Sequence, residues 1–194
     1  MYRGAVSAIA VVLFWAAAGA EVPAIHADAA PAPSHSRLLD QFARSVDARR
    51  LANRWLLVYF GYARCADICP AALTRMTRTL DRLGRAGAAV QPVFVTLDPE
   101  HDSPAVLRAF AAHFTPRLIA LTGSKEAIDA ATHRFSVQWH PNAGEMGIDH
   151  GALVYLAAPD GRIVQIFYPQ EPVAEMAAAI RARVAAAAAR DHLG

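Results

Sequence analysis

Cysteine is scarce in this sequence of 194 residues, which contains only Cys65 and Cys69. Two cysteines cannot build a four-cysteine zinc site. The sequence also lacks a block of lysine and arginine of the kind that follows a phosphate backbone, because its charges are mixed in sign along the chain and sum to only +2. Nucleic acid is therefore not an expected partner. No internal repeat is visible.

The length allows one domain with a hydrophobic core and a short leader, and two ordinary domains would need more residues. The hydrophobic fraction of 55% is high for a soluble protein. Much of it is alanine, which is concentrated in residues 1–20 and 185–189. The rest of the chain has the composition of ordinary globular material, so we expect a single folded domain.

The first residues have the layout of a secretory signal. Arg3 precedes an apolar stretch over residues 5–18, and Ala18-Gly19-Ala20 offers small residues for cleavage. We therefore expect residues 1–20 to be a signal peptide or signal anchor, and the protein to be exported to the periplasmic side, soluble or anchored by this segment. The apolar stretch is shorter than the roughly 20 residues of a relaxed transmembrane helix. No cysteine lies near the cleavage site, so lipid attachment there is not expected.

The next segment has the composition of a tether. Residues 21–36 contain Pro23, Pro31 and Pro33 among several alanines, which predicts a flexible linker. The folded domain is then expected over residues 37–194.

Two apolar runs mark the centre of the predicted sheet. Residues 55–61 (WLLVYFG) and 90–97 (VQPVFVTL) are rich in β-branched and aromatic residues, as expected for strands buried on both faces. Between them, Pro70 suits a first helical residue, and apolar residues recur at helical spacing as far as Gly84. These elements form a strand-helix-strand unit.

The βα alternation continues and ends in a hairpin. We expect a helix over residues 104–114, a strand over 118–121 and a helix over 124–134. Residues 152–157 and 162–167 are strand-like runs joined by a turn sequence, and Glu171-Pro172 opens a terminal helix. The fold class predicted is α/β: a thioredoxin-like fold with a central mixed sheet flanked by helices and a C-terminal β-hairpin and helix.

The two cysteines carry the clearest local signal. They stand four positions apart in Cys65-Ala66-Asp67-Ile68-Cys69, directly after a buried strand and at the start of a helix. Exposed N–H groups and the positive end of the helix dipole favour the thiolate, which is the form that reacts or binds metal. Three intervening residues leave room for a soft ion such as Cu(I) between the sulfurs.

Two other interpretations of the cysteines remain open at this point. An exported protein could use them as a plain disulfide, although closing so small a loop removes little entropy from the unfolded chain. The same thiols, with lowered pKa values, would also serve as a purely redox-active pair.

Several motifs occur in the order seen in one known family. They are Leu39-Asp40-Gln41-Phe42, Phe60-Gly61-Tyr62, Cys65-x-Asp67-x-Cys69-Pro70, Val95-Thr96-Leu97-Asp98-Pro99-Glu100, Leu121-Thr122-Gly123 and Ile148-Asp149-His150. On these motifs the chain resembles the Sco/SenC family from about residue 38 to residue 167. The resemblance implies a thioredoxin-like fold, binding of Cu(I) or Cu(II) by the two cysteines and one distant histidine, and assistance in assembling the copper centre of cytochrome c oxidase. The distant histidine corresponds to His150.

The residues themselves give a weaker argument for His150. It stands just before an expected strand, in a loop after a stretch rich in proline and glycine over residues 141–147, where a side chain can project into a site. A lone histidine at such a position is more often a hydrogen-bonded structural residue. Two thiolates and one imidazole suit Cu(I) in trigonal geometry, and they could hold Cu(II) if another donor or water completes the coordination.

Three carboxylates are candidates for the surroundings of the metal. Asp98 and Asp102 flank the loop after the second central strand, at the sheet edge that also carries the cysteines. Asp102 or Ser103 could instead cap the following helix. Asp67, between the cysteines, could tune the thiolates or contact a partner, and the alternative is an exposed, solvated carboxylate.

Two residues beside the cysteines depart from the family pattern. Ala66 stands where the family usually has proline, which loosens the loop. Arg64 brings a positive charge beside the thiols and should lower their pKa values. Both changes favour redox chemistry slightly.

The sequence thus predicts a copper metallochaperone whose partner is a copper-acceptor protein, either a cytochrome c oxidase subunit or another copper chaperone. In this case His150 is essential. The alternative is a thiol-disulfide oxidoreductase that reduces the acceptor's cysteines, in which Cys65 and Cys69 are the catalytic pair and His150 is dispensable. A peroxide-reducing enzyme would need an activating threonine and arginine around one cysteine, and nothing in the spacing indicates them.

Overall fold

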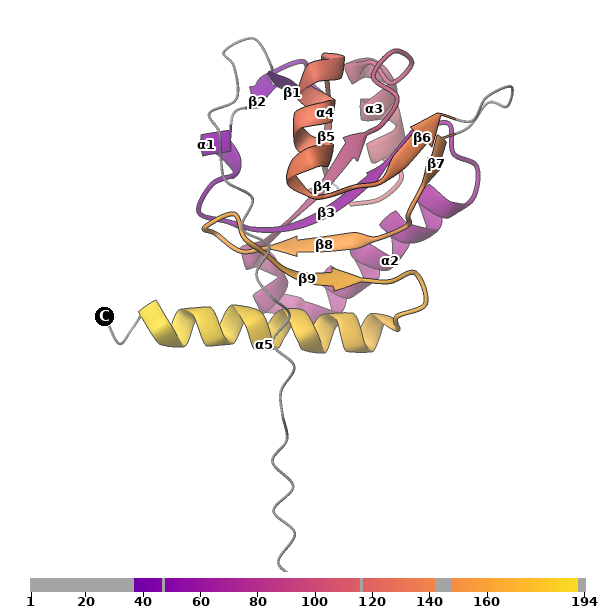
Figure 1. Ribbon diagram of the computed structural model, residues 1–194. Coiled ribbons are helices and arrows are strands. Elements are labelled where there is room, and N and C mark those ends of the chain that lie inside the picture. The colour runs from indigo at the N-terminus through magenta and orange to yellow at the C-terminus, as the bar shows by residue number, and fades with distance from the viewer. Residues whose placement is uncertain (1–36, 47, 116, 142–147, 192–194) are drawn as a thin grey trace, which may run out of the picture.

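A mixed sheet of seven strands forms the centre of the computed structural model, which describes residues 37–191 except 47, 116 and 142–147 (Figure 1). Across the sheet the strands are β2 (Ser45–Val46), β1 (Leu38–Asp40), β5 (Ile119–Gly123), β4 (Val90–Thr96), β3 (Trp55–Gly61), β8 (Val154–Ala157) and β9 (Ile163–Phe167). The three central strands β5, β4 and β3 are parallel, whereas β1 and β8 join them antiparallel. The predicted central mixed sheet is confirmed.

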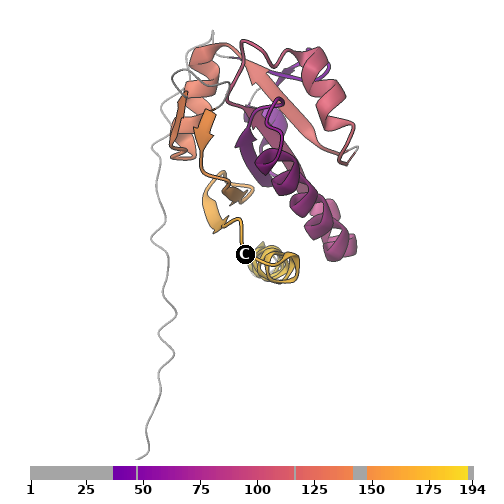
Figure 2. The ribbon, with the colours of Figure 1, turned by 90° about the vertical axis from the view of Figure 1, so that its right-hand side faces the viewer.

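Helices cover both faces of this sheet. They are α1 (Ala48–Leu51), α2 (Ile68–Leu83), the 3-10 helix η1 (Gly84–Ala89), α3 (Pro104–Ala111), α4 (Lys125–Arg134) and α5 (Val173–Asp191). The buried side chains of α2, α3 and α5 belong to one core cluster, and those of α4 belong to a second one. Figure 2 shows α4 on one side of the sheet and α2 and α3 on the other.

Strand β3 explains why the two clusters are separate. Successive side chains of a strand point to opposite faces, and here Trp55, Leu57 and Tyr59 enter the first cluster while Val58 and Phe60 enter the second. A strand that is buried on both faces must be apolar at every position, which accounts for the run over residues 55–61.

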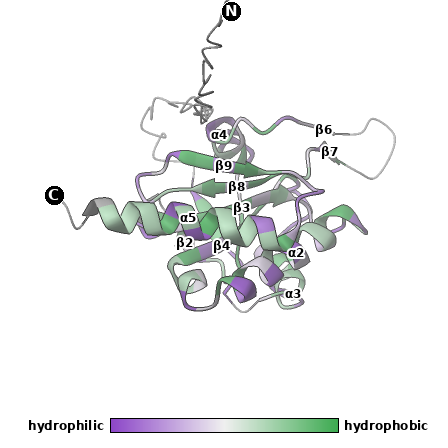
Figure 3. Ribbon diagram, turned by 90° about the horizontal axis from the view of Figure 1, so that it is seen from below, coloured by the Kyte–Doolittle hydropathy of each residue, from purple (hydrophilic) through white to green (hydrophobic). Residues whose placement is uncertain are grey.

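Helix α5 closes the first cluster. Its residues Met176 and Ile180 are fully buried together with Phe167 at the end of β9. Figure 3 shows the hydrophobic strands β8 and β9 beside this helix. Within the part of the chain that the structure describes, no helix combines the length and the apolar character needed to cross a membrane. The expected signal segment and linker, residues 1–36, lie outside the described residues.

The helix starts follow local hydrogen bonding. The side chains of Ser103 and Ser124 cap α3 and α4, each accepting a hydrogen bond from an N–H three residues ahead at 3.3 Å. Helix α2 begins at Ile68, two residues earlier than predicted. Pro70 is therefore its third residue, which is still within the first turn, where no intrahelical partner for the N–H is needed.

The predicted C-terminal hairpin is confirmed, since β8 and β9 pair antiparallel. In the connecting turn, Gly161 has a φ of +84°, and Asp160 Oδ1 accepts a hydrogen bond from the Arg162 N–H at 2.9 Å. This turn chemistry was readable in the sequence.

A second, two-stranded sheet was not predicted. It consists of β6 (Trp139–Pro141) and β7 (Ile148–His150), which pair antiparallel with Trp139 opposite His150. The expectation that His150 lies in a loop is therefore wrong, because it is the last residue of a strand. Strands of three residues carry too few positions for a periodic pattern, and this one is defined by its pairing partner.

Candidate metal centre

The two cysteines lie at the junction between β3 and α2. Cys65 is partly exposed in the turn before the helix, and Cys69 in the first helical turn is fully buried. The N–H of Cys69 points to the sulfur of Cys65 at 3.4 Å. This arrangement places one sulfur at the surface and the other beneath it, on the same side of the sheet.

Gly61 makes room for the buried sulfur. A Cβ atom at this position would lie 2.8 Å from Cys69 Sγ and 3.0 Å from a ring carbon of Tyr59, distances at which neighbouring atoms must shift. The glycine is thus a packing requirement of the site. Sequence reasoning noted Gly61 only as part of a motif.

His150 reaches the cysteines from a distant part of the chain. Its Nε2 atom lies 3.6 Å from Cys69 Sγ, although the two residues are 81 positions apart. Its Nδ1 atom lies 3.2 Å from the carbonyl oxygen of Gly151. When Nδ1 is protonated and donates a hydrogen bond to this carbonyl, the lone pair of Nε2 lies on the side of the sulfur. The structure therefore brings together Cys69 and the histidine that the resemblance indicated.

Two tyrosines surround this contact. The buried hydroxyl of Tyr59 donates a hydrogen bond to Cys69 Sγ at 3.5 Å. The rings of Tyr59 and Tyr62 each stand edge-on to the His150 ring, with centroids 6.0 Å apart. Neither tyrosine was singled out from the sequence as a site residue. The available signals were that Tyr62 belongs to the Phe60-Gly61-Tyr62 motif and that Tyr59 shares a strand face with Leu57.

The two thiols differ in acidity. Burial raises the pKa of Cys65, but its hydrogen bonds with Cys69 and with the N–H groups of Asp67, Ile68 and Cys69 outweigh burial and hold the pKa below the ordinary value. Burial raises the pKa of Cys69 to about 12. Cys65 is therefore the thiol that ionises readily, and Cys69 keeps its proton until a metal or a reaction removes it.

Arg64 acts differently from the prediction. Its guanidinium donates to Asp98 Oδ2 at 2.7 Å, so its charge is paired with that carboxylate. The predicted lowering of the pKa is wrong for Cys69, where burial dominates. It holds for Cys65, but the cause is hydrogen bonding with Cys69 and at the start of α2.

Asp98 and Asp102 hold the loop that leads to Cys65. Asp102 is fully buried, and its Oδ2 atom accepts hydrogen bonds from the Thr96 hydroxyl at 2.6 Å and the Ala63 N–H at 2.9 Å. Asp98 accepts from Arg64 and lies 2.7 Å from His101 Nδ1. Ser103, and not Asp102, caps α3. The two carboxylates therefore act on neighbours of the cysteine.

Asp67 occupies the N-cap position of α2 and is exposed. Among the described residues its side chain makes no capping hydrogen bond. This agrees with the alternative of a solvated carboxylate, and its role toward the thiolates stays a prediction.

The chemistry of these side chains fits copper. Two sulfurs and one imidazole nitrogen are soft and borderline donors, which suit Cu(I) and can also serve Cu(II). Over residues 37–191, leaving aside the gaps, no three histidine, cysteine, aspartate or glutamate side chains are already arranged to hold a metal ion. Cys69 and His150 are in contact, whereas the sulfur of Cys65 faces the Cys69 N–H. A three-ligand site therefore requires that the sulfur of the partly exposed Cys65 join the sulfur of Cys69 and Nε2 of His150 around one ion.

Comparison with known proteins gives a consistent result along most of the chain. A protein-family model for SCO1/SenC matches residues 26–185. The SCO2-like protein of Rickettsia felis is 34% identical over 136 residues, which are 68% of this chain and 66% of that protein. The chain therefore spans slightly less than two thirds of the length of this relative.

Solved structures share the fold. The structure of Bradyrhizobium japonicum ScoI with copper bound is 31% identical, with a TM-score of 0.66, over 75% of this chain and 94% of that chain. BsSco, a member of the Sco family of cytochrome c oxidase assembly proteins in which a disulfide switch was identified, is 24% identical with a TM-score of 0.64, over 76% of this chain and 90% of that one. The thioredoxin-like architecture predicted from the sequence is confirmed.

Proposed function

The chain belongs to the SCO1/SenC family, and from this premise we propose that it is a copper metallochaperone whose ligands are Cys65, Cys69 and His150. The observation that carries the proposal is the 3.6 Å approach of His150 Nε2 to Cys69 Sγ, one helical turn from the partly exposed Cys65. A histidine held against a cysteine across 81 positions is an arrangement that a simple dithiol pair does not need.

Copper is the cargo in this proposal. Cys65, which is partly exposed and ionises readily, meets the incoming Cu(I) first. Cys69 has a pKa of about 12 and must release its proton when it binds, so copper uptake is accompanied by proton release. The hydrogen bond from Tyr59 helps to hold the Cys69 sulfur, and the Gly151 carbonyl orients the imidazole.

The proposed acceptor is the copper centre of cytochrome c oxidase or another copper chaperone. The relative ScoI of Bradyrhizobium japonicum has copper bound, and BsSco is a cytochrome c oxidase assembly protein. We further propose export to the periplasmic side, with residues 1–20 as signal peptide or anchor, 21–36 as linker and 37–194 as the copper-binding domain. The membrane then contributes only through the N-terminal segment.

A thiol-disulfide oxidoreductase is the second candidate function. The difference in acidity between the two thiols supports it, because a partly exposed thiolate and a buried protonated thiol are suited to attack and resolution. In this reaction the Cys65 thiolate attacks the acceptor's disulfide and one acceptor thiolate leaves. Cys69 then loses its proton, attacks the Cys65 sulfur of the mixed disulfide and releases the second acceptor thiolate. The acceptor is reduced to a dithiol, and Cys65 and Cys69 are oxidised to a disulfide.

Copper stoichiometry and visible absorption separate the two functions. We expect the reduced chain to bind one copper ion with a thiolate-to-Cu(II) band, and His150→Ala and Cys65→Ser to abolish the band. His133→Ala, which changes an exposed histidine on α4, is the matched control and should leave it intact. Copper binding that persists without His150 would make the oxidoreductase the better account.

A further inference from the structure

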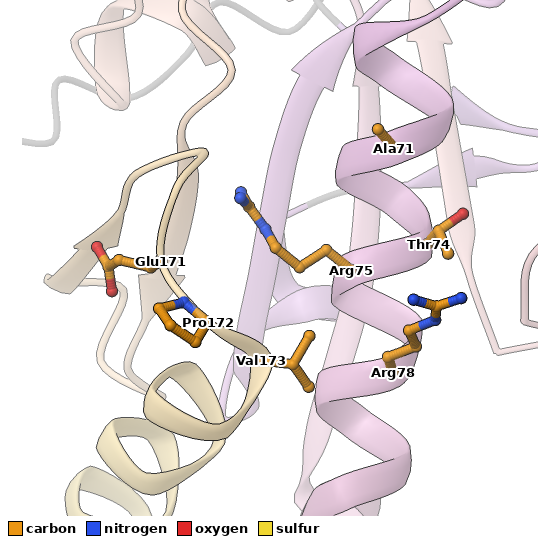
Figure 4. A pocket seen from close by; sticks show the side chains of 7 residues that line it. All are labelled: Ala71, Thr74, Arg75, Arg78, Glu171, Pro172 and Val173. Atoms are coloured by element: carbon orange, nitrogen blue, oxygen red, sulfur yellow. The ribbon is translucent and has the colours of Figure 1, made fainter.

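A groove lies along the middle turns of α2, and neither cysteine lines it. One wall is formed by α2 with Thr74, Arg75 and Arg78, and the other by Glu171 and Val173 where the chain enters α5. Figure 4 shows these side chains between the helix and the segment that leads into α5. The groove thus joins two segments that are about 95 positions apart in sequence.

Arg75 enters the groove with unused donors. Its Nη1 atom donates to the Pro169 carbonyl. Its Nε and Nη2 atoms are buried and have no hydrogen-bond partner among the described residues. A buried donor without a partner destabilises the folded state, and more so when it is charged, so the fold keeps this guanidinium at a cost to its own stability.

Arg78 adds a second positive charge one turn further along the same helix face. It is exposed, and in the described part of the chain it has no ion pair. Glu171 is the acidic residue on the opposite wall, and its carboxylate also accepts a hydrogen bond from the Tyr168 N–H at 2.8 Å. Two arginines against one glutamate leave the groove with a net positive charge.

The groove adjoins the candidate metal centre. Ala71, which lines it, is only two residues after Cys69. A protein that comes to exchange copper or electrons with the cysteines is therefore within reach of both arginines.

We propose that this groove binds an acidic segment of the partner protein, with glutamate or aspartate carboxylates paired to Arg75 and Arg78. The proposal rests on the proposed function, because it assigns the docking site of that same partner. Guanidinium groups pair with carboxylates through two parallel hydrogen bonds. The exposed Arg78 offers such a pair directly, and among the described residues no carboxylate is hydrogen-bonded to the buried donors of Arg75 beside it. The two-walled shape favours an extended chain segment over a flat anionic membrane surface.

A peptide titration tests the groove directly. The probe is a blocked hexapeptide of glutamate, and the matching glutamine hexapeptide controls for shape. We expect the glutamate peptide to shift the NMR amide signals of residues 71–78, Glu171 and Val173. The affinity should fall about fivefold or more in Arg78→Gln, as the loss of a charge-assisted pair implies. Arg85→Gln removes the same charge from an exposed residue outside the groove and should change the affinity less than twofold.

Three results would overturn the proposal. The first is an equal loss of peptide affinity in Arg78→Gln and Arg85→Gln. The second is that inorganic phosphate shifts the same amide signals as strongly as the glutamate peptide. The third is that the signals shift only with anionic phosphatidylglycerol vesicles. Because Arg75 also bonds to the Pro169 carbonyl, Arg75→Gln is interpreted only if its unfolding midpoint matches that of the parent. Copper stoichiometry is measured on the same samples. If the parent protein binds one copper ion but does not bind the glutamate peptide, only the proposed docking groove is rejected. If it binds the peptide but no copper, only the metallochaperone function is rejected.

Discussion

The carboxylate of Asp102 accepts a hydrogen bond from the backbone N–H of Ala63 at 2.9 Å, so the chain after β4 fastens the loop that leads to Cys65. The same oxygen accepts from the Thr96 hydroxyl at 2.6 Å. Asp102→Ala would leave both donors without their acceptor, and we expect it to lower the free energy of unfolding by about 2–3 kcal/mol. Urea denaturation measures this change. Asp160→Ala, which removes an exposed carboxylate paired with Arg162, should cost less than about 1 kcal/mol.

Asp102 should also leave a signature in the pH dependence of stability. Burial raises its pKa above the usual value although the hydrogen bonds from Thr96 and Ala63 lower it, so the folded state holds this proton more tightly than the unfolded state. The resulting stabilisation is full below the pKa of the unfolded state and disappears as the pH rises through the raised pKa. The stability of the parent relative to Asp102→Asn should therefore be greatest in acid and decline with rising pH. A difference that is independent of pH would contradict this assignment.

Gly61→Ala should disturb the buried sulfur. The added Cβ would lie 2.8 Å from Cys69 Sγ, and the surrounding side chains leave little space for adjustment. We expect a loss of about 1–3 kcal/mol in stability and weaker copper binding. Thermal unfolding and copper titration test both effects. Gly151→Ala is the control for the unfolding measurement, because a Cβ there meets its nearest atom at 3.5 Å, which is ordinary contact.

Alkylation should distinguish the two thiols. At neutral pH we expect iodoacetamide to modify Cys65 at least about tenfold faster than Cys69, since the thiolate is the reactive form and Cys69 is buried with a pKa of about 12. Peptide mass spectrometry of briefly labelled protein identifies the modified residue. The labelling rate of Cys65 should rise with pH and become constant at a pH below the ordinary thiol pKa, because the pKa of Cys65 itself is lowered. Equal rates for both cysteines would contradict the structure of the site.

Tyr59→Phe removes the hydroxyl that donates to Cys69. This hydrogen bond lowers the pKa of Cys69 against the larger effect of burial, so its loss should raise that pKa further. Thiolate absorbance against pH, measured in the Cys65→Ser background, reports Cys69 alone. Tyr155→Phe changes a buried tyrosine on the other face of the sheet and should leave the titration unchanged. An unshifted titration in Tyr59→Phe would show that the hydroxyl has no influence on the sulfur.

The parts of the fold that the sequence predicted are those with a long local signal. The unit of β3, α2 and β4 was predicted because a strand buried on both faces must be apolar throughout, and the helix between them repeats its apolar residues over four turns. The β8–β9 hairpin was predicted from its turn residues. In both cases the physical cause lies within the segment itself.

The parts that escaped prediction depend on distant partners. The strand that carries His150 exists because Trp139 pairs with it, and Arg75 matters because a segment about 95 positions away forms the opposite wall of its groove. The burial of Asp102 is equally a result of packing, since its neighbours in sequence are polar. Tyr59 became a site residue only when the sulfur of Cys69 was placed against it.

Strand β3 pairs parallel with β4 and antiparallel with β8, and the pairing with β8 fixes the position of His150 relative to Cys69. Tyr59 stands opposite Val154 of β8, four residues after His150, so the registration of one antiparallel ladder determines how far the imidazole lies from the sulfur. A slip of two residues would preserve the inward faces of β8 but carry the chain before it along the sheet by about 7 Å. The histidine would then be out of reach of the cysteine in a protein whose core looked intact. The correct strand register is thus a requirement for metal binding. Measurements of stability alone would not reveal its loss.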